Sequence, residues 1–117
     1  MALNREWMQV NEALRRWEAL ASVRPTIVAM ARAAELLRES IALDDLHPRL
    51  SHMWLSLGRE GRPRRVGIGW VEASPAFPGE PTGYRVWFIE PSMEITERKS
   101  VGDDELVDVV RERLKDL

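Results

Sequence analysis

The spacing of apolar residues along this chain changes once, near Pro48. Before that residue, apolar side chains recur at alternating steps of four and three positions, which places them on one face of a helix. Two series show this spacing: Leu3, Trp7, Val10, Leu14, Trp17 and Ala21, followed by Ile27, Met30, Ala34, Leu37 and Ile41. Over residues 66–70, apolar side chains instead alternate with glycine, the two-residue period of a strand. The pattern predicts a pair of helices, then a small sheet, then a closing helix.

The helices are predicted over residues 3–21, 25–42 and 103–116. Pro25 suits the first turn of a helix, because backbone N–H groups there make no hydrogen bond within the helix and proline lacks this group. The connection before Pro25 is short, and short connections make neighbouring helices antiparallel, so the first two form a hairpin. One continuous helix kinked at Pro25 is the alternative. The last helix begins with carboxylates and ends with cations, which complements the helix dipole.

Strands are predicted over residues 50–57, 64–73, 84–90 and 93–99. Residues 44–48 are expected to be a linker, because a proline disfavours helix at the residue before it. The segment at 93–99 follows Pro91 and is either a fourth, edge strand or a bent continuation of the third. The fold class is therefore α+β: a helical hairpin, a three- or four-stranded antiparallel sheet, and a C-terminal helix packed on one sheet face.

The composition limits the classes of function. The 117 residues fit a single domain over the whole chain, and the absence of cysteine excludes disulfides, thiol catalysis and cysteine-ligated zinc. There is no apolar run of the ~20 residues that span a bilayer and no signal-peptide pattern, so a cytoplasmic protein is expected. The net charge of −2 does not favour a nucleic-acid binder, which usually carries a basic excess.

Aromatic residues gather in the strands and suggest a binding surface. Five of them lie in three consecutive predicted strands: Trp54, Trp70, Tyr84, Trp87 and Phe88. Because Gly67 and Gly69 leave one strand face nearly bare, we predict a shallow apolar pocket there for a flat ligand or a partner's side chain. The alternative is that a helix covers this face and the tryptophans fill the core, the commoner role of aromatics in strands.

Three further segments offer candidate chemistry. The proline-rich connection at 74–83 carries Phe77 and is either a recognition loop or a stiffened link whose Phe77 packs back on the sheet. The turn at 59–65, with Arg64 and Arg65, could contact phosphates, or its arginines could pair with carboxylates of this chain. Four residues that lie close together in the sequence are of types that bind metal ions: Asp44, Asp45, His47 and His52. Nothing in its spacing fixes a geometry, so turn chemistry is preferred and no metal or cofactor is predicted.

The helical stripe is a candidate interface between two copies of the chain. Trp7, Leu14 and Trp17 widen it, and if the sheet leaves it uncovered it would form a two-fold dimer seam. The alternative is that the two helices cover each other and the sheet. The sequence carries no nucleophile elbow, phosphate loop or HExxH motif, so an enzyme is not favoured.

These features favour a small non-catalytic binding or regulatory protein that acts through protein–protein contact, as a homodimer or with another protein. An adaptor, an inhibitor or an immunity-like protein would fit. The alternative is a small-molecule binder or an enzyme that uses an aromatic pocket between Trp70, Tyr84 and Trp87. Nucleic-acid binding through the turn at 59–65 is the weaker alternative.

Overall fold

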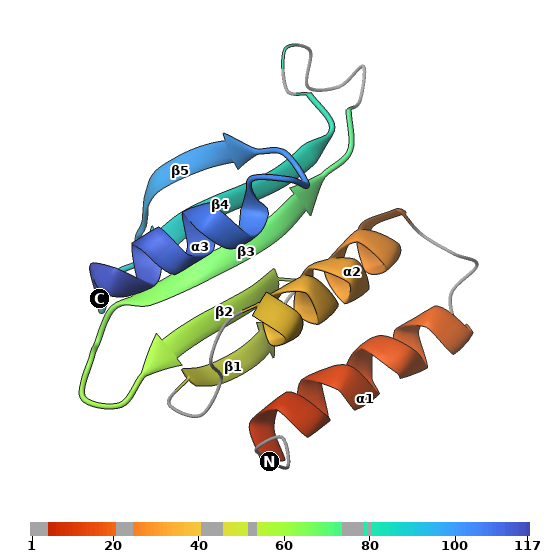
Figure 1. The fold of residues 1–117 in the computed structure, drawn as a ribbon, viewed down its shortest axis with the longest axis horizontal. Helices are drawn as coiled ribbons and strands as arrows, with labels where there is room; N and C mark the ends of the chain where they lie inside the picture. The colour runs from red at the N-terminus through yellow and green to blue at the C-terminus, as the bar shows by residue number, and fades with distance from the viewer. Residues whose placement is uncertain (1–4, 21–24, 41–45, 52–53, 74–78, 80) are drawn as a thin grey trace.

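The computed structural model describes residues 5–20, 25–40, 46–51, 54–73, 79 and 81–117, with the backbone alone at 17–20, 25 and 51. Over these residues the chain forms three helices and five strands (Figure 1). Their order is α1 (Arg5–Leu20), α2 (Pro25–Ser40), β1 (Leu46–Ser51), β2 (Trp54–Arg59), β3 (Arg65–Val71), β4 (Gly83–Ile89), β5 (Ile95–Val101) and α3 (Leu106–Lys115). The α+β fold class is confirmed, with an N-terminal helix pair and a C-terminal helix.

The strands form one antiparallel sheet in the order β1-β2-β3-β4-β5. The prediction of three or four strands was therefore short by at least one, because the single strand predicted over residues 50–57 covers the end of β1 and the start of β2. The related error concerns Pro48. The sequence placed this proline in a linker, whereas it lies inside β1 and is paired in register with Leu57. β1 is an edge strand, hydrogen-bonded to a neighbour strand on one side only, which is where a sheet tolerates a residue without an N–H.

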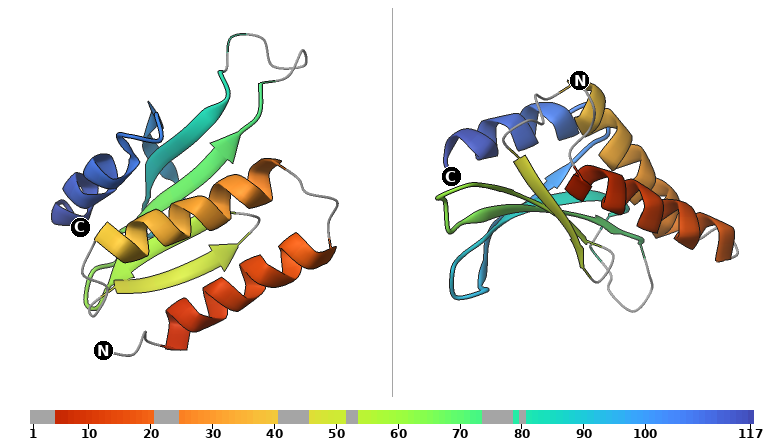
Figure 2. Two further views of the ribbon diagram at one scale, coloured as in Figure 1. Left: turned by 45° about the vertical axis from the view of Figure 1, so that its right-hand side comes forward. Right: turned by 90° about the horizontal axis from the view of Figure 1, so that it is seen from below.

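The described helices pack on one face of the sheet, which gives a two-layer molecule (Figures 1 and 2). α1 lies beside β1, α2 crosses β2 and β3, and α3 covers β3 and β4. α1 and α2 lie side by side as two separate helices and run in opposite directions, which confirms the hairpin and rules out one kinked helix.

The core fills the space between the helices and the sheet. Trp7, Val10 and Leu14 enter it from α1, at the helical spacing that the sequence showed. α2 contributes small residues that bring its backbone close to the sheet, and α3 contributes Leu106, Val110 and Leu114. The strand residues of this layer alternate with those of the opposite face, so every second strand side chain points away from the helices.

We call that opposite side of the sheet the open face, because none of the described helices packs on it (Figure 2, right). It consists of alternate residues of the five strands: His47, Arg49, Trp54, Ser56, Gly58, Arg65, Gly67, Gly69, Val71, Gly83, Arg85, Trp87, Ile89, Ile95, Arg98 and Ser100. The alternative in which a helix covers the glycine face is wrong for the described helices, which all pack on the other face.

Candidate functional site: the open face of the sheet

Trp87 is the centre of the open face. It is paired in register with Gly67, and its indole lies across β3 over both Gly67 and Gly69. A Cβ at Gly67 would lie 2.2 Å from Trp87 Nε1, and a Cβ at Gly69 would lie 2.7 Å from Trp87 Cη2. The two glycines therefore exist in this strand to make room for the ring, the close approach that glycine permits.

Trp54 packs against Trp87 and is the more exposed residue of this aromatic pair. The ring centroids are 5.2 Å apart at an interplanar angle of 77°, an edge-to-face contact. Trp87 is only 4% exposed, whereas Trp54 is 42% exposed. Trp87 Nε1 is buried without a hydrogen-bond partner among the described residues. A half-exposed tryptophan braced on a buried one is a rigid apolar contact surface.

Arg65 lies across β2 on the same face. Its guanidinium occupies the place that a side chain at Gly58 would take, with Nη1 2.2 Å from the position of a Cβ there. Its Nε donates to Ser56 Oγ (3.2 Å) and its Nη2 to the carbonyl oxygens of His47 (2.6 Å) and Ser56 (3.2 Å). Burial, and then the charge of Arg49, lower the pKa of Arg65 from its ordinary value, against the effect of Glu6. The cation is thus held by backbone carbonyls and a hydroxyl.

A shallow hollow of about 80 Å³ lies beside the tryptophan pair. Its wall includes Trp54, Trp87 and Ile95, with two arginines, Arg85 and Arg98. Arg85 is only 2% exposed and donates to the carbonyl oxygens of Tyr84 (3.0 Å) and Pro81 (2.6 Å). The hollow thus combines an apolar wall with two guanidinium groups, of which Arg85 is held by backbone carbonyl oxygens.

A β-bulge aims Arg98 into this face. The register of β4 with β5 shifts between Val86 and Phe88, and Glu97 has a positive φ of 52°. The extra residue places Glu97 with the helix-side network and its neighbour Arg98 beside Trp87. Bulges commonly re-aim side chains next to functional sites, and a non-glycine residue at positive φ costs about 1 kcal/mol or more.

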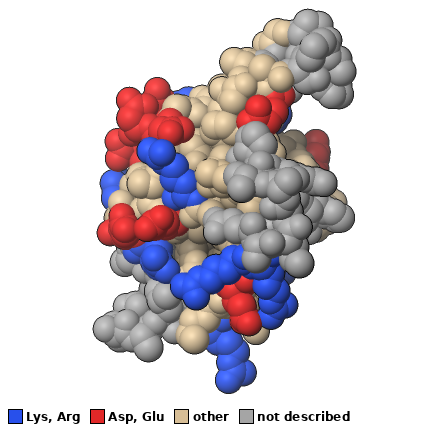
Figure 3. All heavy atoms as spheres, turned by 90° about the vertical axis from the view of Figure 1, so that its right-hand side faces the viewer, with Lys and Arg blue, Asp and Glu red and all other residues tan. Residues whose placement is uncertain are grey.

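Basic side chains predominate at the described strand positions of the open face, and Glu6 of α1 lies beside its β1 edge, in contact with His47. These strand positions include four arginines and, over the five described strands, no aspartate or glutamate: Arg49, Arg65, Arg85 and Arg98. Elsewhere the signs are mixed: on the side where α1 ends and α2 begins, basic and acidic side chains lie interleaved (Figure 3). The net charge of −2 therefore conceals a local basic surface.

Trp70 and Tyr84 lie on the helix side of the sheet, away from Trp87. Their rings are in edge-to-face contact, with the two ring centroids 4.9 Å apart. The Tyr84 hydroxyl donates to the Ala29 carbonyl oxygen of α2 (2.7 Å). Burial raises the pKa of Tyr84 to about 12. Strand alternation therefore separates the side chains of Trp70 and Tyr84 from that of Trp87. Trp70 borders the hollow beside Trp87, and Tyr84 does not.

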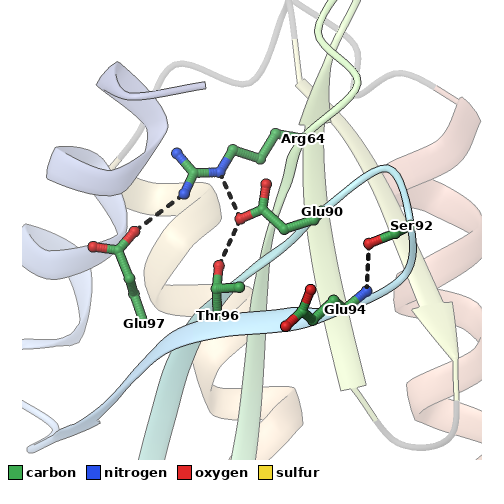
Figure 4. A network of polar contacts seen from close by, with 6 residues as sticks. All are labelled: Arg64, Glu90, Ser92, Glu94, Thr96 and Glu97. Atoms are coloured by element: carbon green, nitrogen blue, oxygen red, sulfur yellow. Dashed lines mark hydrogen bonds and ion pairs between the residues drawn. The ribbon is translucent and has the colours of Figure 1, made fainter.

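Arg64 and Arg65 are adjacent in sequence but serve opposite sides of the sheet. Arg64 lies 3.7 Å from the centroid of the Phe88 ring, and its Nε and Nη2 donate to Glu90 (3.0 Å) and Glu97 (3.1 Å), as Figure 4 shows. The Thr96 hydroxyl also donates to Glu90 (2.5 Å). This hydrogen bond first, and Arg64 after it, lower the pKa of Glu90. The two arginines thus do not form one basic patch at the turn.

Two of the three residues proposed for a dimer seam, Trp7 and Leu14, are not on an uncovered face. Trp7 and Leu14 belong to α1, and their side chains are buried in the core of the single chain. The side chain of Trp17 and all of Phe77 lie outside the described residues. Association of two copies stays a prediction, and Trp7 and Leu14 are not available to carry it.

His47 has a partner other than a metal. Its Nδ1 lies 2.7 Å from Glu6 Oε1 on α1, and both side chains are about 40% exposed. Asp44, Asp45 and His52 lie outside the described residues. In the part of the chain that is described, no three His, Cys, Asp or Glu residues are grouped as metal ligands. No helix there is long and apolar enough to cross a membrane.

The sequence pointed to Trp54, Trp87 and Arg65 but missed Gly58, Arg85 and Arg98. The sequence could have identified Arg85, because it lies two residues before Trp87 and therefore on the same face of a strand. Arg98 does not share the period of Ile95, because the bulge at Glu97 inserts one residue between them. Because β5 is mostly polar, its pattern of hydrophobic residues does not reveal the extra residue of the bulge.

Comparisons with protein-family models, with curated proteins and with solved structures found no match to this chain.

Proposed function

We propose that this chain is a non-catalytic binding protein that contacts another protein through the open face of its sheet. The observation that carries the proposal is the half-exposed Trp54 braced on the buried Trp87, with no described helix over them. Ile95, which is 41% exposed, extends this apolar surface across the sheet. Rigid aromatic anchors surrounded by arginines are typical of the centre of a protein–protein interface.

The alternative of a small-molecule site has less support. The hollow beside Trp54 measures about 80 Å³, whereas small-molecule pockets commonly hold ~300–1,000 Å³. A wider groove of about 470 Å³ runs between α1 and β1, past Glu6 and Arg49, and is open to solvent. Neither has the convergent polar groups of a catalytic site.

Site-specific photocrosslinking in cells that naturally make the chain tests the proposal. A benzoylphenylalanine in place of Trp54 keeps an aromatic side chain at the centre of the open face. The matched control carries the same group in place of Met8, which is 58% exposed on α1 in the helix layer. We expect ultraviolet light to link the Trp54 variant, but not the Met8 variant, to a discrete protein that protease removes and nuclease does not. Adducts of equal yield at both positions, or none at Trp54, would refute the proposal.

A further inference from the structure

Trp87 Nε1 is a buried hydrogen-bond donor of the open face that has no acceptor among the described residues. The whole residue is only 4% exposed. A buried N–H of this kind gives up its hydrogen bond to water on folding and gains none in return, which destabilises the folded chain. A ring without the N–H would pack in the same place without this cost. The nitrogen therefore suggests that a ligand supplies the acceptor.

Trp87 lies at one end of a row of residues that crosses four strands of the open face. Strand register places Trp87 beside Gly67. Gly67 is paired in turn with Ser56, and Ser56 with Arg49. Nε1 lies 2.2 Å from the Cβ position of Gly67, and residues directly opposed in an antiparallel pair have Cβ atoms about 4.5–5.5 Å apart. The Ser56 hydroxyl is therefore the polar side-chain group on the strand next to Nε1. We call Arg49, Ser56, Gly67 and Trp87 the donor row.

Each polar side chain of the donor row can donate a hydrogen bond to a ligand. Ser56 Oγ accepts from Arg65 Nε (3.2 Å), which leaves the hydrogen of its hydroxyl for donation. Arg49 is exposed and forms no hydrogen bond or ion pair with another described residue. Burial first, and the charge of Arg49 after it, lower the pKa of Arg65, so the Arg49 guanidinium lies close to this face. Donors from β1, β2 and β4 thus share one row.

We propose that the donor row binds a carboxylate of the partner protein, which accepts hydrogen bonds from Trp87 Nε1, the Ser56 hydroxyl and the Arg49 guanidinium. This inference rests on the proposed function and specifies what the partner presents. A carboxylate has two oxygens with about four acceptor positions and no donor, so it can satisfy all three groups. A single carbonyl oxygen has only two lone pairs.

Charge complementarity favours a carboxylate over a neutral acceptor. Arg65 donates to a hydroxyl and to backbone carbonyl oxygens, which are neutral and leave its positive charge in place. Arg49 adds a second positive charge beside it. The acidic residue that acts on Arg65 is Glu6, whose carboxylate is in contact with His47. Two cations therefore face one acidic side chain at this end of the sheet, and a carboxylate from the partner improves the balance.

The donor row is reached from its β1 end. Arg49 is exposed there and Ser56 is half-buried, whereas Trp87 Nε1 is covered in the unbound chain. Trp54, which is 42% exposed and packs edge-to-face against Trp87, lies two residues before Ser56 on the same face. Trp54 and Arg49 must shift to let an anion reach Nε1. Both are exposed side chains, so this movement leaves the core between the helices and the sheet intact.

Nuclear magnetic resonance of the tryptophan indole N–H groups, labelled with nitrogen-15, tests the inference. The probes are sodium acetate, its neutral isostere acetamide, and dimethyl phosphate as the anion of a nucleic-acid backbone, all at constant ionic strength. Trp87→Phe assigns the Trp87 resonance. The test variants are Arg49→Gln and Ser56→Ala, and Arg49→Lys retains the charge. Arg16→Gln is the matched control, because it removes one cation from the exposed surface of α1. Circular dichroism of each variant verifies that the fold is retained.

We expect acetate to shift the Trp87 indole proton to higher frequency in a saturable manner, at lower concentration than dimethyl phosphate or acetamide. Arg49→Gln and Ser56→Ala should each weaken acetate binding by about two- to tenfold, and Arg49→Lys and Arg16→Gln by less than about twofold. A Trp87 resonance that does not respond to acetate, tighter binding of dimethyl phosphate or acetamide, or equal losses in Arg49→Gln and Arg16→Gln would overturn the inference. Protein adducts at position 54 of a chain whose Trp87 resonance ignores acetate would leave the proposed function standing and remove only the carboxylate site.

Discussion

Replacing Gly67 by alanine tests how Trp87 is seated on the open face. The new Cβ would lie 2.2, 2.5 and 2.8 Å from Nε1, Cε2 and Cδ1 of the Trp87 indole, where ordinary contacts are 3.4–4 Å. The ring must move by about an ångström to reach ordinary contact distance, and Trp54 packs edge-to-face against it. Overpacking of this kind costs about 1–3 kcal/mol.

A double-mutant cycle with Trp87→Ala separates this clash from a general cost of alanine in the strand. Trp87→Ala alone should lower the free energy of unfolding by about 3–5 kcal/mol, since Trp87 is almost fully buried. With the indole removed, alanine at Gly67 meets no ring, and its φ lies outside the left-handed range. There it should be neutral or stabilising by about 0.4–1 kcal/mol, because it restricts the unfolded chain. The expected coupling energy is about 1–3 kcal/mol.

Urea unfolding followed by far-ultraviolet circular dichroism measures the four free energies of unfolding. The control cycle pairs Trp87→Ala with Gly61→Ala, since Gly61 has a φ of +75° and nothing within 4 Å of its Cβ position. Alanine there is destabilising through backbone strain alone, so its effect should add to that of Trp87→Ala. Additive effects of Gly67→Ala and Trp87→Ala would show that the indole does not lie on Gly67.

Three further predictions concern the core and the polar network. Trp7→Ala should lower the free energy of unfolding by about 3–5 kcal/mol; the loss should not depend on protein concentration, and a strong dependence would indicate that Trp7 lies between two copies instead. The pKa of Tyr84 is raised to about 12 from 10.0 in the folded protein, so as the pH rises the tyrosine hydroxyl ionises first in the unfolded chain. The free energy of unfolding of the wild-type protein should therefore fall as the pH rises between these two values. Tyr84→Phe should remove this fall, and an equal fall in both proteins contradicts the burial of the hydroxyl. The pKa of Glu90 is lowered from 4.5 by Thr96 first and then by Arg64, so the unfolded chain takes up a proton first as the pH falls through that value. Wild-type stability should then decrease on acidification more steeply than that of Glu90→Gln, and parallel urea titrations from neutral to acidic pH would show whether it does.

The order of helices and strands was predictable because each element repeats its own period. The spacing of four and three residues in α1 and α2 placed Trp7, Leu14 and Leu37 on buried faces, as the structure confirms. The prediction was wrong around Pro48, where local rules favour a linker. Whether a proline is tolerated in a strand depends on whether that strand lies at an edge of the sheet, and the strand order decides this.

The candidate site was only partly predictable from the sequence. Alternation in β3 separated Gly67 and Gly69 from Val66 and Ile68, which correctly identified a bare face. It did not show which aromatic residue would lie on that face. Alternation within β3 places Trp70 opposite the glycines, on the face of Val66 and Ile68. Only the register of β4 with β3 places Trp87 over Gly67.

By itself, then, the sequence determined the class of fold, the helix faces and the existence of a glycine-lined strand face, because these depend on periods within a few residues. The tertiary structure decided that the described helices share one side of the sheet and that a bulge at Glu97 directs Arg98 to the other. It also brought four arginines from β1, β3, β4 and β5 onto the open face. Strand pairing sets such neighbours across long stretches of chain, and no local pattern of hydrophobic and polar residues records them.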